Sequence, residues 1–279
     1  MKELINGTYI GERAKFMSKD MTIRNCVFED GESPLKESSN LDIYDTEFRW
    51  KYPLWYCKDV KCHNVTFKET ARSGVWYTNN IEFTDCNIDA PKTFRRSEWI
   101  KLTNVNLFNA QETLWKCKNV KLNRVYVKGD YFGFNSSDIE IDDLHLDGNY
   151  CFDGGKNIVI RNSVLNSKDS FWNCENITII NSTINGEYLS WNSKNVTFIN
   201  CSIISHQGLC YMENVKLINC KLINTDLCFE FCKDIEAEVI NVVDSIKNPI
   251  NGRIKVEGVK ELILDKNIID PSKTEILIG

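Results

Sequence analysis

Five of the seven tryptophans in this 279-residue chain recur at spacings close to multiples of 20 residues, with charged residues near them. The tryptophans are Trp55, Trp76, Trp115, Trp172 and Trp191, and the charged residues are Arg95, Asp130, Asp153, Lys168, Asp169 and Glu187. Flat apolar faces of sugar rings can stack on large aromatic rings. A pair of carboxylates can act as general acid and base on a glycosidic bond. A cation can bind a uronate carboxylate, or remove a proton once its pKa is lowered. These residue types therefore indicate carbohydrate chemistry if the fold brings them together.

A repeat of 19 to 21 residues runs through the chain. One residue of each repeat, here called the register residue, comes directly before the first aliphatic residue of a short alternating segment. The register residues are Asp20, Asn40, Asp59, Asn80, Trp99, Asn119, Asp138, Asn157, Asn176, Asn195, Asn214 and Asp234. A fixed period of this length predicts a solenoid.

The spacing inside each repeat indicates what kind of solenoid it is. Aliphatic residues one and three positions after the register residue alternate with polar ones, which is the pattern of a β-strand. A turn-forming Asn or Asp follows five positions after it, and a second alternating pair comes next. A third short segment precedes the register residue. We therefore predict an all-β, right-handed parallel β-helix of about 12–13 turns of roughly 19–20 residues, with three short strands per turn. A leucine-rich repeat is excluded because its fixed leucines and helical back are missing.

The ends of the chain depart from the repeat. Residues 1–17 fit an incomplete first turn, and the pattern fades after Asp234. We expect one β-helix domain over residues 1–243 and a C-terminal cap over residues 244–279, which would cover the last sheet edge.

The third segment contains the tryptophans. Four positions before the register residue, the tryptophan column reads Phe16, Lys36, Trp55, Trp76, Arg95, Trp115, Phe134, Asp153, Trp172, Trp191, Cys210 and Glu230. The preceding position, here called the inner column, is apolar or small outside the incomplete first turn. Adjacent strand residues face opposite sides, and burying four charges would cost more than exposing five indoles. We expect the tryptophan column to face solvent, although an inward aromatic stack remains the alternative.

Two further outward columns, here called the polar columns, lie seven and eight positions before the register residue. They contain tyrosine, carboxylates and cations, so together with the tryptophan column they define one candidate surface. The candidate catalytic residues are Asp153, Asp169, Asp130, Glu187, Lys168 and Arg95, and the candidate sugar-binding residues are Trp76, Trp115, Phe134, Trp172, Tyr188, Trp191 and His206. The alternative is a solvated surface whose charges pair with one another.

The twelve cysteines occupy columns that also hold Ser, Thr and Val, which is typical of small buried residues. No Cys-x-x-Cys occurs and the three histidines lie far apart, so we expect no metal site and no cofactor. Asn-x-Ser/Thr sequences such as Asn195-Val196-Thr197 follow from the repeat, and we expect their Asn residues to close corners in a hydrogen-bonded ladder.

Composition excludes several classes of protein. The net charge of −5 argues against a nucleic-acid partner, and no apolar run approaches the length of a membrane span. The first residues lack the apolar stretch of a secretory signal, which favours a cytoplasmic protein.

Several stretches of the third segment carry a family resemblance. Residues 31–38, 51–57, 90–96, 110–115 and 186–192 resemble a bacterial family of unknown function within the pectin-lyase-like superfamily of right-handed parallel β-helices. The resemblance covers essentially the whole chain. It implies the fold, and the superfamily includes acidic-polysaccharide lyases, glycoside hydrolases, non-enzymatic binders and phage fibres.

Three hypotheses follow. The first is a glycoside hydrolase or polysaccharide lyase that acts on an oligosaccharide along the candidate surface. The second is a non-catalytic module that binds a glycan or a protein there. The third is a structural solenoid in which the aromatic surface forms a homo-oligomer interface.

Overall fold

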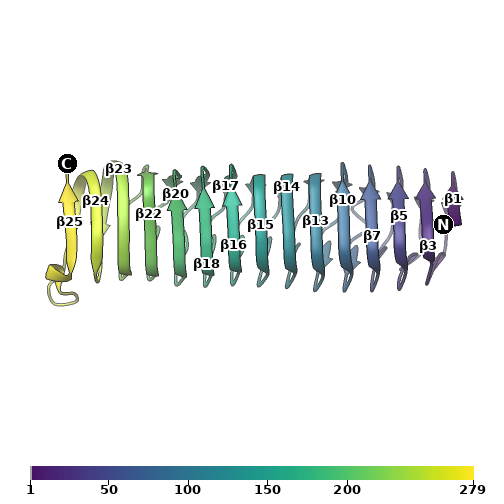
Figure 1. Ribbon diagram of the computed structural model, residues 1–279, viewed down its shortest axis with the longest axis horizontal. Coiled ribbons are helices and arrows are strands. Elements are labelled where there is room, and N and C mark those ends of the chain that lie inside the picture. Colours follow the sequence, from purple (N-terminus) through teal and green to yellow (C-terminus); the bar gives the residue numbers. More distant parts are fainter. Residues whose placement is uncertain (1) are drawn as a thin grey trace. The chain divides into compact units, whose positions relative to one another are not determined.

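The computed structural model describes residues 2–279 as parallel strands stacked turn upon turn. The chain divides into two compact units, unit 1 ending at His145 and unit 2 beginning at Leu146. The strands within each unit lie side by side in chain order (Figure 1). The prediction of an all-β parallel β-helix is confirmed.

In unit 1, the first strand of each turn pairs in parallel and in register with its equivalent on the next turn. These strands are β1 (Lys2–Ile5), β3 (Lys19–Arg24), β5 (Ser39–Tyr44), β7 (Lys58–His63), β10 (Asn79–Thr84), β13 (Glu98–Leu107) and β14 (Lys118–Lys128). The second strands are β2 (Thr8–Tyr9), β4 (Val27–Phe28), β6 (Glu47–Phe48), β8 (Thr66–Phe67) and β11 (Asn87–Ile88). The strand β15 (Ser137–Asp147) crosses the boundary between the units.

Unit 2 repeats this arrangement. Its first strands are β16 (Lys156–Arg161), β18 (Glu175–Ile180), β20 (Lys194–Ile199), β22 (Glu213–Leu222), β23 (Lys233–Lys247), β24 (Gly252–Ile263) and β25 (Thr274–Ile278). Its second strands are β17 (Val164–Asn166), β19 (Thr183–Asn185) and β21 (Ser202–Ile204). A short 3-10 helix, η1 (Pro271–Lys273), precedes β25. No helix among residues 2–279 is long and apolar enough to cross a membrane.

The ends differ from the sequence-based expectation. In the first turn, predicted to be incomplete, β1, β2 and residues 11–17 all bond to the next turn. The expected cap over residues 244–279 contains the end of β23 together with β24 and β25, which continue the parallel pairing. Within residues 2–279 the first strands therefore number fifteen, whereas 12–13 turns were predicted, because pairing continues where the Asn pattern has faded.

Corner residues explain the high Asn content. The register residues Asn176, Asn195 and Asn214 have φ values of 61°, 55° and 57°. Asn tolerates this left-handed conformation better than other non-Gly residues. Asn195 Nδ2 donates to Asn176 Oδ1 at 2.9 Å, and Asn214 Nδ2 donates to Asn195 Oδ1 at 2.8 Å. The predicted Asn ladder is confirmed.

The third segment of each turn, here called the turn-rich side, consists of tight turns. The prediction of a third strand on every turn is wrong, because two-residue strands occur there only at β9 (Val75–Trp76) and β12 (Phe94–Arg95) within the described chain. In one turn of unit 2, the alternate residues Asp169, Phe171 and Asn173 have φ values of 54°, 57° and 55°. This alternation curls the backbone instead of extending it.

The core fills the inside of each turn. Inner-column residues such as Leu54, Phe94, Leu114 and Phe171 are fully buried. The twelve cysteines are buried free thiols. Side chains one position after the inner column therefore point outward, and these positions form the candidate site.

Candidate functional site

The tryptophan column points away from the core. Its five indoles are half-buried, whereas the inner column beside them is buried. Each indole N–H donates to a backbone carbonyl of the following turn, as in the bond from Trp172 Nε1 to Tyr188 O at 2.6 Å. These bonds fix the plane of each ring, so the availability of a ring to a ligand depends on what covers its two faces.

In unit 1, the ring faces are occupied by other side chains. Trp55 and Trp76 stack with centroids 5.1 Å apart and planes 8° from parallel. The Arg95 guanidinium lies 4.7 Å from the Trp76 centroid and 4.4 Å from that of Trp115. The other neighbour of Trp115 in the column is Phe134, at 4.9 Å. The candidate residues Trp76 and Trp115 therefore form a closed stack with Arg95 between them.

A carboxylate holds Arg95 inside this stack. Arg95 Nη2 lies 3.1 Å from Glu112 Oε2, and Lys92 Nζ lies 3.2 Å from the same oxygen. Arg95 is thus a component of the stack, with a carboxylate from a polar column as its counter-ion. Asp130, the other candidate catalytic residue in unit 1, lies one turn after Glu112. Its backbone N–H donates to the Gln111 side chain at 3.3 Å.

In unit 2, the stack is open at one end. Trp172 and Trp191 lie 5.6 Å apart with planes 7° from parallel, and Trp191 also contacts Tyr211 and Tyr188. Trp191 is the only ring or cation in the described chain that contacts Trp172. The turn that packs on its other side carries Asp153 at the tryptophan-column position, as the bond from Gly154 N to Trp172 O shows. The column neighbour of Trp172 on this side is therefore a carboxylate residue instead of an aromatic one.

Two carboxylates near this face differ in their surroundings. Asp153 is half-buried and accepts a hydrogen bond from Asn173 Nδ2 at 3.1 Å. Asp169 precedes Trp172 by three residues and is only 5% exposed. Its carboxylate has no hydrogen bond or ion pair within residues 2–279. Burial raises the pKa of Asp169, opposed by the charge of Lys168 and reinforced by that of Glu187.

The other two predicted charges of this region pair with each other. Lys168 Nζ lies 3.1 Å from Glu187 Oε2 and 5.4 Å from the centroid of Tyr188. The hydrogen bond with Glu187 raises the pKa of Lys168. The ion pair stabilises the protonated form of Lys168, which argues against the hypothesis that Lys168 acts as a base with a lowered pKa.

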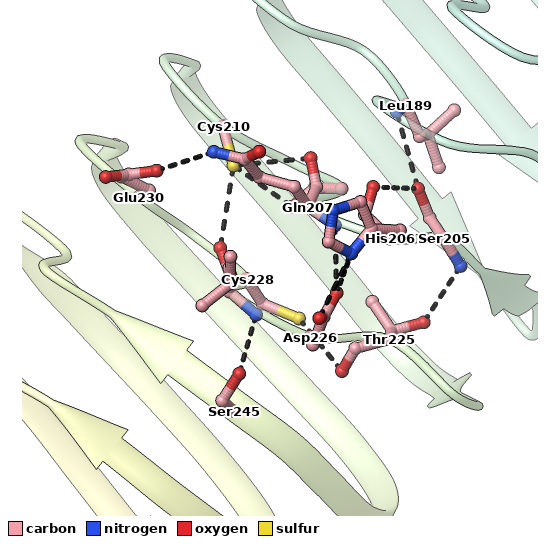
Figure 2. Close-up of polar contacts among 12 residues, drawn as sticks. Leu189, Ser205, His206, Gln207, Cys210, Thr225, Asp226, Cys228, Glu230 and Ser245 are labelled. Atoms are coloured by element: carbon pink, nitrogen blue, oxygen red, sulfur yellow. Dashed lines mark hydrogen bonds and ion pairs between the residues drawn. The ribbon is translucent and has the colours of Figure 1, made fainter.

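A polar cluster surrounds His206 and Gln207 (Figure 2). It adjoins Trp191, whose indole N–H donates to Gln207 O at 2.8 Å. His206 Nδ1 lies 2.8 Å from Asp226 Oδ1, and Gln207 N donates to the same oxygen at 3.0 Å. Gln207 Nε2 donates to Glu230 Oε2 at 3.0 Å, and Lys247 Nζ pairs with Glu230 Oε1 at 2.8 Å. The repeat places Asp226 in the same polar column as His206, but sequence reasoning selected only His206 as a site residue. It missed Lys247, which lies beyond the last register residue, Asp234.

A hollow of about 470 Å³ lies beside Tyr211 and Phe231, and Asn192, Lys194 and Glu213 are among its polar lining residues. Sequence reasoning also missed this region, although the positions three before the register residue hold Tyr56, Tyr77, Tyr211 and Phe231. No group of three or more metal-ligating side chains occurs within residues 2–279.

The structure therefore divides the predicted site between the two units. Arg95, Asp130, Trp76, Trp115 and Phe134 belong to unit 1. Asp153, Lys168, Asp169, Glu187, Trp172, Tyr188, Trp191 and His206 belong to unit 2. We call Asp153, Asp169, Trp172 and Asn173 of unit 2 the Trp172 site. They combine a ring face that contacts no other ring or cation with two carboxylates that form no ion pair within residues 2–279.

Comparison with known proteins places the chain in a family. The model of a family of proteins of unknown function, DUF3737, matches residues 2–277. The chain belongs to this family. No curated protein matches.

Solved structures resemble the chain in fold. One is PfbA, a surface adhesin of Streptococcus pneumoniae, with a TM-score of 0.54 and 11% identity over 83% of this chain and 84% of that one. Another is the A-module of a mannuronan C-5 epimerase of Azotobacter vinelandii, with a TM-score of 0.30 and 7% identity over 99% and 88% of the two chains. At 11% identity, the likeness to PfbA concerns the fold alone.

Proposed function

We propose that this chain is a glycan-binding β-helix protein and that the Trp172 site holds a sugar ring. The observation that carries the proposal is the open face of Trp172 next to Asp153. An indole fixed by its own hydrogen bond offers an apolar platform without losing further conformational freedom on binding. The adjacent carboxylates can accept hydrogen bonds from sugar hydroxyl groups.

Neighbouring groups support the same function. The ion pair between Lys168 and Glu187 lies on the same side of unit 2, and Tyr188 packs edge-on against Trp191 at 5.3 Å. Together they give a rigid surface with polar groups around an aromatic platform, which is the composition of a small-ligand site.

A glycan array tests this proposal directly. Binding of the labelled protein is measured for the wild type, for Trp172→Ala and for the control Trp99→Ala. Trp99 is 61% exposed and lies at a register position in unit 1, away from the turn-rich side. We expect Trp172→Ala to weaken binding by about tenfold, because a stacked aromatic contact contributes on the order of 1 kcal/mol beyond the buried area. Trp99→Ala should bind normally. Equal losses in both variants, or no binding by the wild type, would contradict the proposal.

Glycoside hydrolysis is a second candidate, and the raised pKa of Asp169 favours it. A general acid needs a carboxyl group with a raised pKa near an ionised partner. We assign the partner role to Asp153, which holds the tryptophan-column position on the preceding turn. The test is release of reducing ends from neutral oligosaccharides. Hydrolysis predicts that Asp169→Asn and Asp153→Asn each abolish turnover while the variants still bind these neutral sugars. If the wild type shows no turnover, hydrolysis is excluded and glycan binding remains as the proposed function.

A further inference from the structure

The Trp172 site has an equivalent in unit 1 that already contains a cation. The repeat gives the two sets of residues the same positions relative to their register residues. Asp153, Asp169 and Trp172 correspond to Arg95, Glu112 and Trp115, in that order. In unit 1, Arg95 lies 4.4 Å from the Trp115 centroid, and its Nη2 lies 3.1 Å from a carboxylate oxygen of Glu112. This is a complete arrangement of ring face, cation and counter-ion, supplied entirely by the chain.

Unit 2 keeps the ring and the carboxylate and lacks the cation. Asp153 stands where unit 1 has Arg95, and Asp169 stands where unit 1 has Glu112. Neither Asp153 nor Asp169 forms an ion pair in the described chain. The nearby Lys168 is held by Glu187 at 3.1 Å, and Lys247 is held by Glu230 at 2.8 Å. Two carboxylates therefore remain uncompensated beside one open indole face.

Asp169 adds an independent observation. The residue is only 5% exposed, and its carboxylate has no hydrogen-bond partner among the described residues, although the carboxylate oxygens keep contact with solvent. Burying a charge without a partner is costly, and burial raises the pKa of Asp169 accordingly. A positive group that arrives from solution would remove this penalty, whereas an anionic ligand would increase it.

We propose that the Trp172 site binds the ammonium group of an amino sugar. The inference rests on the proposed glycan binding and specifies its ligand class. The sugar ring stacks on the open face of Trp172, and its ammonium group takes the position that Arg95 has in unit 1, within reach of Asp153 and Asp169. Cations are stabilised over indole faces, and carboxylates supply the charge-assisted hydrogen bonds.

The same contacts disfavour a uronate ligand. The cations that could receive a uronate carboxylate, Lys168 and Arg95, are already bound to Glu187 and Glu112. A uronate at Trp172 would instead meet Asp153 and Asp169, which carry the same charge as its carboxylate. The unpaired charges of the site therefore select for a cationic sugar.

Isothermal titration calorimetry with two matched probes tests the proposal. One probe is a short (1→4)-linked glucosamine oligomer and the other is its N-acetylated counterpart, at a pH of about 6 where the free amine is protonated. We expect the glucosamine oligomer to bind at least about tenfold more tightly, with an advantage that shrinks as salt is added.

Two variants locate the effect. Asp169→Asn removes the counter-ion, and Asp153→Arg reproduces the unit 1 arrangement, so each should abolish the preference for the amine. If circular dichroism shows that Asp153→Arg does not fold, Asp169→Asn alone provides the test. The control Glu261→Gln, at an exposed position on β24, should keep the preference.

The outcomes separate the two proposals. Equal affinity for both probes, or preference for the N-acetylated or a uronate oligomer, overturns the amino-sugar inference and leaves glycan binding intact. Binding of oligolysine without binding of any glycan overturns the inference and the proposed function together. Loss of the preference in Glu261→Gln would overturn the assignment to Asp153 and Asp169.

Discussion

At the scale of single residues, the pair Arg95 and Asp153 decides how the aromatic column can be used. Both occupy the tryptophan-column position on the turn that precedes a tryptophan. Arg95 fills the space between two rings, whereas Asp153 leaves one face of Trp172 open. Their place in the column was predictable from the repeat. Which ring faces are covered was not, because this depends on side-chain stacking across turns rather than on residue type.

Asp169 should reduce the stability of the protein at neutral pH. Because burial raises its folded-state pKa, the folded state binds a proton more tightly than the unfolded state. Its contribution to stability is therefore fully present below the unfolded pKa of about 3.9 and is lost as pH rises through the folded value. Lys168 and Glu187 are the charged neighbours that modify this shift.

We expect Asp169→Asn to raise the thermal unfolding midpoint at pH 7, since the neutral amide avoids burial of a charge. The gain should shrink as pH is lowered toward about 4, where the wild-type carboxyl becomes protonated. Thermal unfolding followed by circular dichroism at several pH values measures it, with Glu261→Gln as the exposed control. A variant that is less stable than the wild type at pH 7 would contradict this explanation.

At the scale of elements, the corner ladder links each turn to the next. The repeat predicted these corners because Asn or Asp recurs at the positions that need a left-handed backbone, such as Asn176 and Asn195. The turn-rich side was not predicted, since bulky residues such as Leu114, Phe152 and Phe171 also adopt positive φ there. Nothing in those residue types indicates a turn, so the segment resembles an alternating strand in sequence.

Asn195 offers a test of the ladder. Asn195→Ala loses the hydrogen bonds to Asn176 and Asn214 and also places a Cβ-bearing residue without a polar side chain at φ 55°. We expect it to lower the free energy of unfolding by about 2–3 kcal/mol. Asn195→Gly loses the same bonds but tolerates the backbone, so it should cost about 1 kcal/mol less.

Denaturant unfolding of the two variants separates the ladder from the backbone preference. Equal stability of both variants would show that the left-handed conformation contributes little. Wild-type stability in Asn195→Gly would show that the ladder bonds contribute little.

At the scale of the whole molecule, buried thiols follow the repeat through both units. Burial raises the pKa of Cys117 and of Cys151 to about 12. The exception is Cys220, where the hydrogen bond with Cys201 lowers the pKa of the thiol. The sequence predicted these columns as small buried positions because Cys alternates there with Ser, Thr and Val.

We expect the native protein to react slowly with a thiol reagent such as 5,5′-dithiobis(2-nitrobenzoate), because all twelve cysteines are buried. Unfolding in guanidinium should release all twelve at once. If one thiol reacts in the native state, peptide mapping should identify Cys220. Rapid reaction of several thiols without unfolding would contradict the buried placement.

The in-register stacking of unit 2 makes its length adjustable. Asn176 and Asn195 occupy equivalent corners 19 residues apart, and each bonds to the corner before it. Excision of residues 176–194 would join Glu175 directly to Asn195 and place Asn195 over Asn157. Every residue that remains would keep the same kind of neighbour on the turns before and after it. Such a chain can gain or lose a coil by duplication or deletion of a short gene segment and still fold, so its size can evolve independently of its cross-section.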